Sequence, residues 1–266
     1  MRIIRFTSGG KIHHGKWLDA TTALAIDGDL FGSFTVTDRK LKVEKLLAPL
    51  VPVDILCIGA NYRQHVIETK GEFPERPQLF IKAGNTLNNP FDPIPIPRLS
   101  SQIDYECELA VIIGKKAKYV SREKALDYVF GYTAANDVSS RDWQRDKALG
   151  GGQFARGKSF DGFCPLGPWI VTADEIRNPN ALGIKTILNG QTMQDLTTGD
   201  MIFDVPALIE SVSSTMTLRP GAVILTGTPQ GVGMARTPPV WLKDGDHIVV
   251  EIEKIGRLEN PVRNEA

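Results

Sequence analysis

The sequence predicts a mixed α/β fold that consists mostly of strands. Short apolar runs end repeatedly at glycine or proline, which is typical of strands joined by turns. Segments with helical spacing are few and short, and they do not alternate regularly with strands, so a doubly wound parallel sheet is not expected. With 266 residues, 42% hydrophobic and 23% charged, the chain is long and apolar enough to bury a globular core.

Composition excludes several classes of partner. The 31 basic and 31 acidic side chains cancel, so the chain lacks the broad basic field of proteins that bind nucleic acids or anionic membranes. There is no run of 18 apolar residues, and residues 1–10 lack the apolar core of a secretory signal. The three cysteines have neither disulfide-framework nor zinc-site spacing. We therefore expect a cytoplasmic protein that binds neither nucleic acid nor membrane.

Two domains are predicted, a small N-terminal one at 1–50 and the main one at 51–266. The first should consist of short strands separated by glycine-containing turns. These turns are expected at Gly9 and Gly10, at Gly28 and Asp29, and at Gly32 and Ser33.

The main domain is expected to begin with a buried strand at 55–58, which Gly59 ends and one or two helical turns at 61–68 follow. Proline alternates with apolar residues at 91–97, so this segment should be extended, at a sheet edge or in a loop. The other expected elements are strands at 109–113 and 223–225 and helices at 121–127 and 205–212, capped by Ser121 and Asp204.

Three acidic side chains, Asp104, Glu106 and Glu108, lead into the apolar run at 109–113. The strand period of two places them on one face, about 7 Å apart. Acids that enter a core are usually bound to a partner, and a set of oxygen ligands favours Mg²⁺, Mn²⁺ or Ca²⁺ over zinc. A solvated strand face paired with lysines is the alternative, and these residues alone leave both open.

Asp137 follows the apolar stretch 129–135, and the ends of strands commonly present ligands and catalytic groups. It can also be read as a helix N-cap, because the turn that ends in Trp143 and Gln144 is able to start a helix. The preference for aspartate at that position favours the cap when these residues are considered alone.

His65 and Glu68 are three residues apart, on the same side of a helical turn. The carboxylate is therefore able to orient the imidazole as a general base toward water. Pairs of this kind are also common on surface helices that have no catalytic function.

Residues 152–159 match the phosphate-loop pattern G-x-x-x-x-G-K-[ST], which would indicate a nucleotide-hydrolysing enzyme. A phosphate loop lies between a hydrophobic strand and a long helix, whereas polar residues precede this segment and prolines and glycines follow it at 160–168. Nucleotide binding is therefore not expected. Lys158 nonetheless lies where the backbone can approach a ligand closely. A glycine-rich turn at 225–233 is either a site for a substrate carboxylate or a plain loop.

Taken together, these segments resemble the fumarylacetoacetate hydrolase family, specifically its shorter bacterial and organellar members. The matching pieces, in the family's order, are CIGANYRQHVIE (57–68), F-x-K (80–82), YECELAVIIGK (105–115), NDVSSRDWQ (136–144), GKSFDGFCPLGPW (157–169) and LTGTPQGVG (225–233). The resemblance extends over residues 51–260. No shared motif is evident in residues 1–50.

The resemblance implies a β-roll catalytic domain, usually in a homodimer. It implies Mg²⁺ or Mn²⁺, with Ca²⁺ as a substitute in vitro, held by Glu106, Glu108 and Asp137, and it thereby replaces the capping interpretation of Asp137. The pair His65 and Glu68 would belong to a lid and activate water. The other residues implied are Lys158, catalytic and in contact with the substrate, and Arg141, Gln144, Thr228 and Lys82, which would bind the substrate.

The activity implied first is metal-dependent hydrolysis of a C–C bond in a 2,4-dioxo acid, such as an acylpyruvate. The negative charge of the departing enolate would be met by the metal and by Lys158. Oxaloacetate decarboxylase or tautomerase, and an isomerase acting on 2-hydroxyhepta-2,4-diene-1,7-dioate, use the same kind of site and stay open. A non-enzymatic module that binds metal and a 2-oxo acid is the remaining class, and the presence of His65, Glu68 and Lys158 argues against it.

Overall fold

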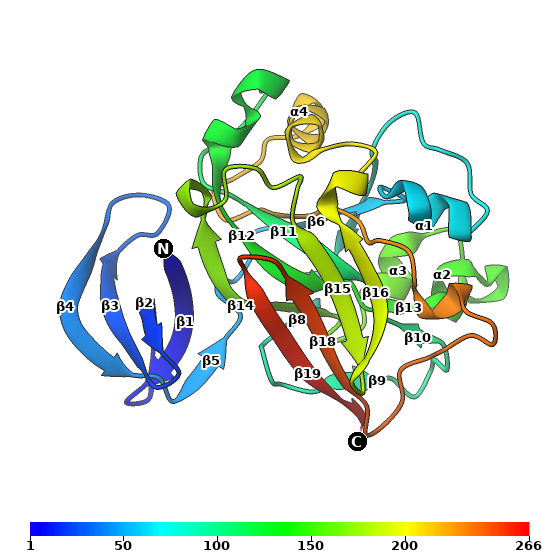
Figure 1. Cartoon of the computed structure of the whole chain (residues 1–266), viewed down its shortest axis with the longest axis horizontal. Coiled ribbons are helices and arrows are strands. Elements are labelled where there is room, and N and C mark those ends of the chain that lie inside the picture. Colours follow the sequence, from blue (N-terminus) through cyan, green and yellow to red (C-terminus); the bar gives the residue numbers. More distant parts are fainter. Residues whose placement is uncertain (266) are drawn as a thin grey trace.

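A computed structural model describes residues 1–265 and confirms the mostly β architecture (Figure 1). The strands are β1 (Arg2–Ser8), β2 (Lys11–Asp19), β3 (Thr22–Gly28), β4 (Phe34–Lys42), β5 (Lys45–Leu47), β6 (Ile55–Gly59), β7 (Gln78–Lys82), β8 (Leu87–Asn88), β9 (Ile94–Ile96), β10 (Ile103–Asp104), β11 (Cys107–Ile113), β12 (Val129–Asn136), β13 (Ser139–Ser140), β14 (Cys164–Thr172), β15 (Gly183–Leu188), β16 (Gln191–Thr197), β17 (Val223–Leu225), β18 (His247–Ile252) and β19 (Gly256–Asn264).

The helices are short. The α-helices are α1 (Arg63–Glu68), α2 (Arg141–Arg145), α3 (Phe154–Lys158) and α4 (Val205–Thr215), and the 3₁₀ helices are η1 (Gly84–Thr86), η2 (Arg122–Tyr128), η3 (Lys147–Leu149), η4 (Ala173–Glu175), η5 (Thr198–Asp200) and η6 (Gly233–Ala235). No helix in residues 1–265 is long and apolar enough to cross a membrane.

The largest sheet follows the order β4-β3-β2-β1-β14-β12-β11-β17-β6-β7, with β5 added beside β1 and β8 beside β14. A second sheet has the order β16-β15-β18-β19-β9, and β10 pairs with β13. The strands β15 and β18 pack against the middle of the large sheet (Figure 1). The main core lies between these two layers.

The position of strand β11, which is buried on both faces, explains why its sequence is a continuous apolar run. Leu109 and Val111 belong to the core between the sheets, which also contains Ile184 and Val250. Ala110 and Ile112, on the other face, belong to a second core cluster. A strand that is buried on both faces needs apolar side chains at every position, each contributing up to about 1.5–3 kcal/mol.

Strands β1–β5 form a distinct lobe at the left of Figure 1. This lobe joins the rest of the chain through a short antiparallel ladder of β1 with β14, where Arg2 pairs with Val171 and Ile3 with Ile170. The short strands predicted for this part are confirmed. The division into domains at residue 50 stays a prediction.

Most elements predicted for the main domain are confirmed. The predicted buried strand is β6, and the predicted helical turns after it form α1. The proline-rich segment at 91–97 contains β9, at the edge of the second sheet. The Asp204 side chain caps α4 by accepting a hydrogen bond from the amide of Ala207 (3.0 Å).

Ser121 does occupy the predicted N-cap position, but its side chain does not cap the helix. The residues that follow it form the 3₁₀ helix η2, and the Ser121 side chain makes no capping hydrogen bond. The amide of Arg122, at the start of η2, instead donates to Glu210 of α4 (3.2 Å). A partner from another element has replaced the local cap.

The phosphate-loop pattern is not a phosphate loop in the structure. The five-residue helix α3 lies inside the pattern, and the next regular element is the strand β14. Within residues 141–172 there is neither a strand before the pattern nor a long helix after it. The rejection of a nucleotide site therefore agrees with the fold.

Candidate active site

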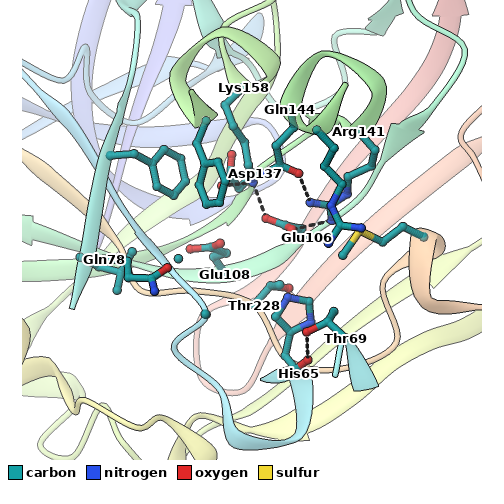
Figure 2. A pocket seen from close by; sticks show the side chains of 17 residues that line it. His65, Thr69, Gln78, Glu106, Glu108, Asp137, Arg141, Gln144, Lys158 and Thr228 are labelled. Carbon is teal, nitrogen blue, oxygen red and sulfur yellow. Dashed lines mark hydrogen bonds and ion pairs between the residues drawn. The ribbon is translucent and has the colours of Figure 1, made fainter. Parts of the chain in front are cut away.

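The predicted polar side chains converge on one cavity of about 150 Å³ (Figure 2). Of the ten residues singled out from the sequence, all except Glu68 and Lys82 line this cavity. They come from widely separated parts of the chain. The sequence motifs thus describe a single site.

Three buried acids lie on one wall of the cavity. Glu106 immediately precedes β11, Glu108 is its second residue, and Asp137 follows β12. The two strands are antiparallel neighbours and the amide of Asp137 donates to the carbonyl of Glu106 (2.9 Å), which brings the acids to the same end of the ladder. One oxygen from each carboxylate lies within 4.8 Å of the others, so the three acids can hold a metal ion.

Asp104 does not join this group, so the expectation that it shares a face with Glu106 and Glu108 is wrong. The strand is interrupted between β10 and β11, which breaks the period of two. The carboxylate of Asp104 accepts hydrogen bonds from the amides of Gly233 (2.7 Å) and Met234 (3.0 Å) and from Nε of Arg141 (2.8 Å).

Three cations hold the acids in place. Nζ of Lys158 donates to Glu106 (2.5 Å) and Asp137 (2.6 Å), and Nη2 of Arg141 donates to Glu106 (2.6 Å). Lys82 donates to Asp137 (2.7 Å) and is buried away from the cavity lining. Unlike Lys158 and Arg141, it does not line the cavity, and its predicted role in substrate binding stays a prediction.

The two glutamates of this wall differ in their electrostatics. Burial by itself raises the pKa of Glu106, but the positive charges of Lys158 and Arg141 outweigh burial and hold that pKa well below its ordinary value. Burial and the negative charges of Asp137 and Glu106 raise the pKa of Glu108 far above its ordinary value.

Glu108 is the uncompensated member of the group. Its carboxylate accepts one hydrogen bond, from the amide of Gly227 (2.6 Å), and it makes no ion pair among residues 1–265. A buried carboxylate without a cation is unstable, and a hard divalent cation is the kind of partner that would compensate it.

The glycine-rich turn at 225–233 binds acids of the protein itself. The amides of Gly227, Gly231 and Gly233 donate to Glu108, Glu68 and Asp104, respectively. The alternative in which these amides hold a substrate carboxylate is therefore not what the structure shows. At Gly231, with φ of +100°, an added Cβ would lie 2.2 Å from the carbonyl oxygen of Met193, so the turn requires glycine there.

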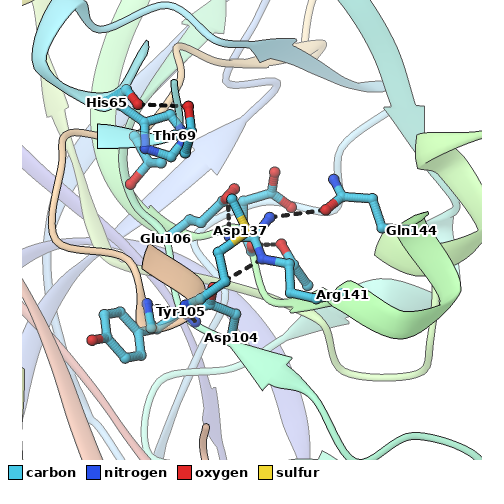
Figure 3. A network of polar contacts seen from close by, with 12 residues as sticks. His65, Thr69, Asp104, Tyr105, Glu106, Asp137, Arg141 and Gln144 are labelled. Carbon is cyan, nitrogen blue, oxygen red and sulfur yellow. Dashed lines mark hydrogen bonds and ion pairs between the residues drawn. The ribbon is translucent and has the colours of Figure 1, made fainter. Parts of the chain in front are cut away.

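His65 faces the cavity from α1, apart from the network formed by Asp104, Glu106, Arg141 and Gln144 (Figure 3). Its Nδ1 lies 2.8 Å from Oε1 of Glu68. Glu68 lies behind the imidazole, and its other oxygen accepts a hydrogen bond from Gly231 (2.8 Å). Glu68 thus links the helix to the glycine-rich turn.

Two neutral side chains present donors to the cavity. Oε1 of Gln144 accepts from Arg141 (3.0 Å), which leaves the amide NH₂ free. Oγ1 of Thr228 accepts from Nε2 of Gln194 (2.8 Å), so the hydroxyl hydrogen stays available. Both residues suit an anionic ligand.

Sequence reasoning missed part of the lining. The additional side chains include Thr69, Gln78, Phe80, Arg145, Phe154 and Met234. Gln78 and Phe80 share a strand face with Lys82, and Arg145 lies one helical turn beyond Arg141, so periodicity from the recognised residues gave a signal for three of them. Phe154 and Met234 belong to the short helices α3 and η6, whose positions periodicity does not predict.

Comparison with known families matches nearly the whole chain. Residues 54–263 match the family model described as fumarylacetoacetate (FAA) hydrolase C-terminal. Residues 1–49, in which sequence reasoning found no motif, match a model described as Rv2993c-like, N-terminal.

Individual relatives are similar in sequence and structure. The mitochondrial oxaloacetate tautomerase fahd2 of Xenopus laevis is 49% identical over 218 residues, which is 82% of this chain and 68% of that protein. The crystal structure of 5-carboxymethyl-2-hydroxymuconate delta-isomerase from Mycobacterium smegmatis is 37% identical, with a TM-score of 0.88 over 100% of both chains. Fumarylacetoacetate hydrolase from Exiguobacterium antarcticum is 39% identical, with a TM-score of 0.86 over 100% of both chains.

Proposed function

Since the chain belongs to the fumarylacetoacetate hydrolase family and is an enzyme, we propose that it tautomerises or isomerises a small 2-oxo acid with the help of a divalent metal. The observation that carries this proposal is the His65–Glu68 pair, which faces the buried acids across one small cavity. Relatives named as a tautomerase and an isomerase support it. This order reverses the one drawn from sequence, in which hydrolysis came first.

Glu106, Glu108 and Asp137 are the proposed ligands of Mg²⁺ or Mn²⁺. The fit rests on their oxygen-only donor set and on Glu108, which is buried without a cation. The metal, when bound, supplies Lewis acidity and a template for the carboxylate and 2-oxo oxygens of the acid.

The protein's own residues orient the substrate. The free amide of Gln144 and the hydroxyl of Thr228 donate hydrogen bonds to the anionic acid. Burial would lower the pKa of Lys158, but Asp137 and Glu106 raise it above its ordinary value, so this side chain stays an ammonium ion. Its positive charge stabilises the enolate oxygen that develops during proton transfer.

His65 is the proposed proton carrier. Because Nδ1 is bonded to Glu68, Nε2 is the nitrogen left to take a proton from the carbon next to the 2-oxo group. The electron pair of that C–H bond forms the enolate. Return of the proton to the enolate oxygen completes tautomerisation, and return to a different carbon of a conjugated substrate completes isomerisation.

Hydrolysis of a 2,4-dioxo acid is the second candidate function, and the same pair favours it. A histidine oriented by a half-buried carboxylate can take a proton from water as well as from carbon. Hydrolysis puts one oxygen of the solvent into the carboxylic acid product, whereas tautomerisation exchanges a C–H hydrogen.

Isotope exchange separates the two candidates. Oxaloacetate and 2,4-dioxopentanoate would be incubated with the Mg²⁺-loaded protein in D₂O or in H₂¹⁸O, and the products followed by NMR and mass spectrometry. We expect deuterium at C3 of oxaloacetate above the uncatalysed rate and no cleavage of the dioxo acid. His65→Ala should slow the exchange by about 10²- to 10⁴-fold. Cleavage with ¹⁸O in the new carboxylate would establish hydrolysis instead.

A further inference from the structure

Arg145 differs from the other cations at the cavity. Lys158 and Arg141 also line it, but each is buried and paired with carboxylates of the protein. Arg145 is exposed and makes no hydrogen bond or ion pair with the rest of residues 1–265 through its side chain. Its guanidinium group is therefore the lining cation that is available to a ligand.

The position of Arg145 follows from helix α2. Arg141 and Arg145 are four residues apart, so they lie on the same side of the helix. Arg141 reaches the buried acids, whereas Arg145 is one turn farther along, at the exposed end of the same helix. The two arginines thus mark a buried and an exposed part of one cavity.

The backbone beneath Arg145 is held in place. The amide of Gly152 donates to the carbonyl of Gln144 (3.1 Å), which folds the following loop back onto α2. A Cβ at Gly151 would lie 2.4 Å from the carbonyl carbon of Arg145, so the loop packs closely there. The base of the side chain is fixed although its end is exposed.

The other lining side chains that lie outside the acid cluster offer no second positive charge of this kind. They include Phe80 and Phe154, whose rings are 5.6 Å apart, and the neutral Gln78 and Met234. A negatively charged group at the far end of a substrate would therefore meet one free cation. The planar guanidinium group is suited to binding a carboxylate through two parallel hydrogen bonds.

We propose that Arg145 binds a second carboxylate of the substrate and so selects 2-oxo diacids over 2-oxo monoacids. This inference rests on the proposed action on a 2-oxo acid and adds the substrate class. In it Arg141 and Lys158 serve the buried, metal-proximal end of the substrate, and Arg145 determines specificity at the other end.

The test compares two acids with the same four-carbon chain, oxaloacetate and 2-oxobutanoate, which differ at C4. Their affinities for the Mg²⁺-loaded protein would be measured by calorimetry for the parent, Arg145→Gln and Lys147→Gln. Lys147 is an exposed cation two residues away that does not line the cavity, so it provides the matched control. We expect the parent to bind oxaloacetate about tenfold more tightly, as one charge-assisted hydrogen bond allows.

Arg145→Gln should remove that preference and leave the affinity for 2-oxobutanoate as it was, while Lys147→Gln should retain the preference. A parent that binds both acids equally, or a preference that survives in Arg145→Gln, would overturn the inference and leave the proposed function standing. A parent that binds neither acid would contradict the proposed function itself and the inference with it.

Discussion

The two sides of the cavity are built differently. On one side Glu106 immediately precedes β11 and Asp137 immediately follows β12, two neighbouring strands of the large sheet, and both acids are held by buried cations at 2.5–2.7 Å. On the other side His65 comes from α1, a helix of six residues, and its main polar contact is with Glu68. Within residues 1–265, the side chains of that pair have one further hydrogen bond to the site, from the amide of Gly231 to Glu68.

This difference separates binding from proton transfer. Ligands of a metal must be preorganised, because each misplaced carboxylate weakens the site. A proton carrier must meet its substrate and then let the product leave, which suits a short element with few contacts. We infer that the wall formed by Glu106, Glu108 and Asp137, the acid wall, determines the stability of the protein and its metal binding. The wall formed by His65 and Glu68, the histidine wall, determines the rate of the reaction.

The largest effect is expected from Asp137→Ala. The change leaves the ammonium group of Lys82 buried without its carboxylate and removes one of the two carboxylates bound by Lys158. Loss of one partner from a buried ion pair costs about 3–5 kcal/mol, so the free energy of unfolding should fall by that amount. Stabilisation by Mg²⁺ or Mn²⁺ should also disappear.

Thermal unfolding with and without metal checks this prediction, and Asp38→Ala is its control because Asp38 is exposed on β4. The control should keep both the stability and the response to metal. A response to Mn²⁺ in Asp137→Ala that equals that of the parent would remove Asp137 from the ligand set.

Glu68→Gln should have a smaller effect, confined to the rate. The introduced glutamine could still accept the hydrogen bond from Gly231, but a neutral amide stabilises a protonated imidazole less well than a carboxylate does. We expect kcat to fall about tenfold, since the protonated imidazole that forms during proton transfer is stabilised less well.

Steady-state kinetics over a range of pH would measure this effect beside Glu72→Gln, an exposed change in the following loop. Metal affinity should be the same in all three proteins. A drop in kcat that is accompanied by an equal loss of metal affinity would mean that Glu68 has a purely structural role.

The contrast between the walls also shows what can be predicted from the sequence. The acids of β11 and the pair on α1 obey the local periods of strand and helix, so their spacing by itself indicates chemistry. The spacing does not show that Asp104 turns away, because the interruption between β10 and β11 depends on hydrogen bonds from Gly233 and Met234, which lie 129 and 130 residues later in the chain.

Contacts between residues that are far apart in the sequence also explain the other differences between the predictions and the structure. The role of Lys82 follows from the meeting of β7 with the end of β12, and the cap of η2 comes from Glu210 on α4. The resemblance to a family identified the cavity residues although none of these contacts is visible in local patterns. The resemblance could not show which cations are paired with carboxylates of the protein and which are free to bind a ligand.

The smallest expected effect concerns Glu108, which should release protons when a metal binds to the acid wall. Burial and the charges of Asp137 and Glu106 raise the pKa of Glu108 in the metal-free protein, so this carboxyl keeps its proton to a higher pH than an ordinary glutamate does. A metal binds the carboxylate form, and metal affinity should therefore fall as the pH is lowered. Calorimetry of Mg²⁺ or Mn²⁺ binding in buffers of different ionisation enthalpy should detect the release of protons on binding.

The raised pKa of Glu108 also determines in which direction pH changes the stability of the protein. At a pH below the ordinary pKa of glutamate, Glu108 is neutral and contributes its full share of stability to the folded protein. This stability is lost as the pH rises through the raised pKa of Glu108 in the folded protein. Glu108→Gln keeps an acceptor for the amide of Gly227 and removes the unpaired charge. Without metal at pH 8, it should unfold at a higher temperature than the parent, because it buries no ionisable group that lacks a cation. With metal the order should reverse, because only the parent gains binding energy. A metal-free Glu108→Gln protein that is less stable than the parent would show that Glu108 is already compensated, and the acid wall would then need no cation.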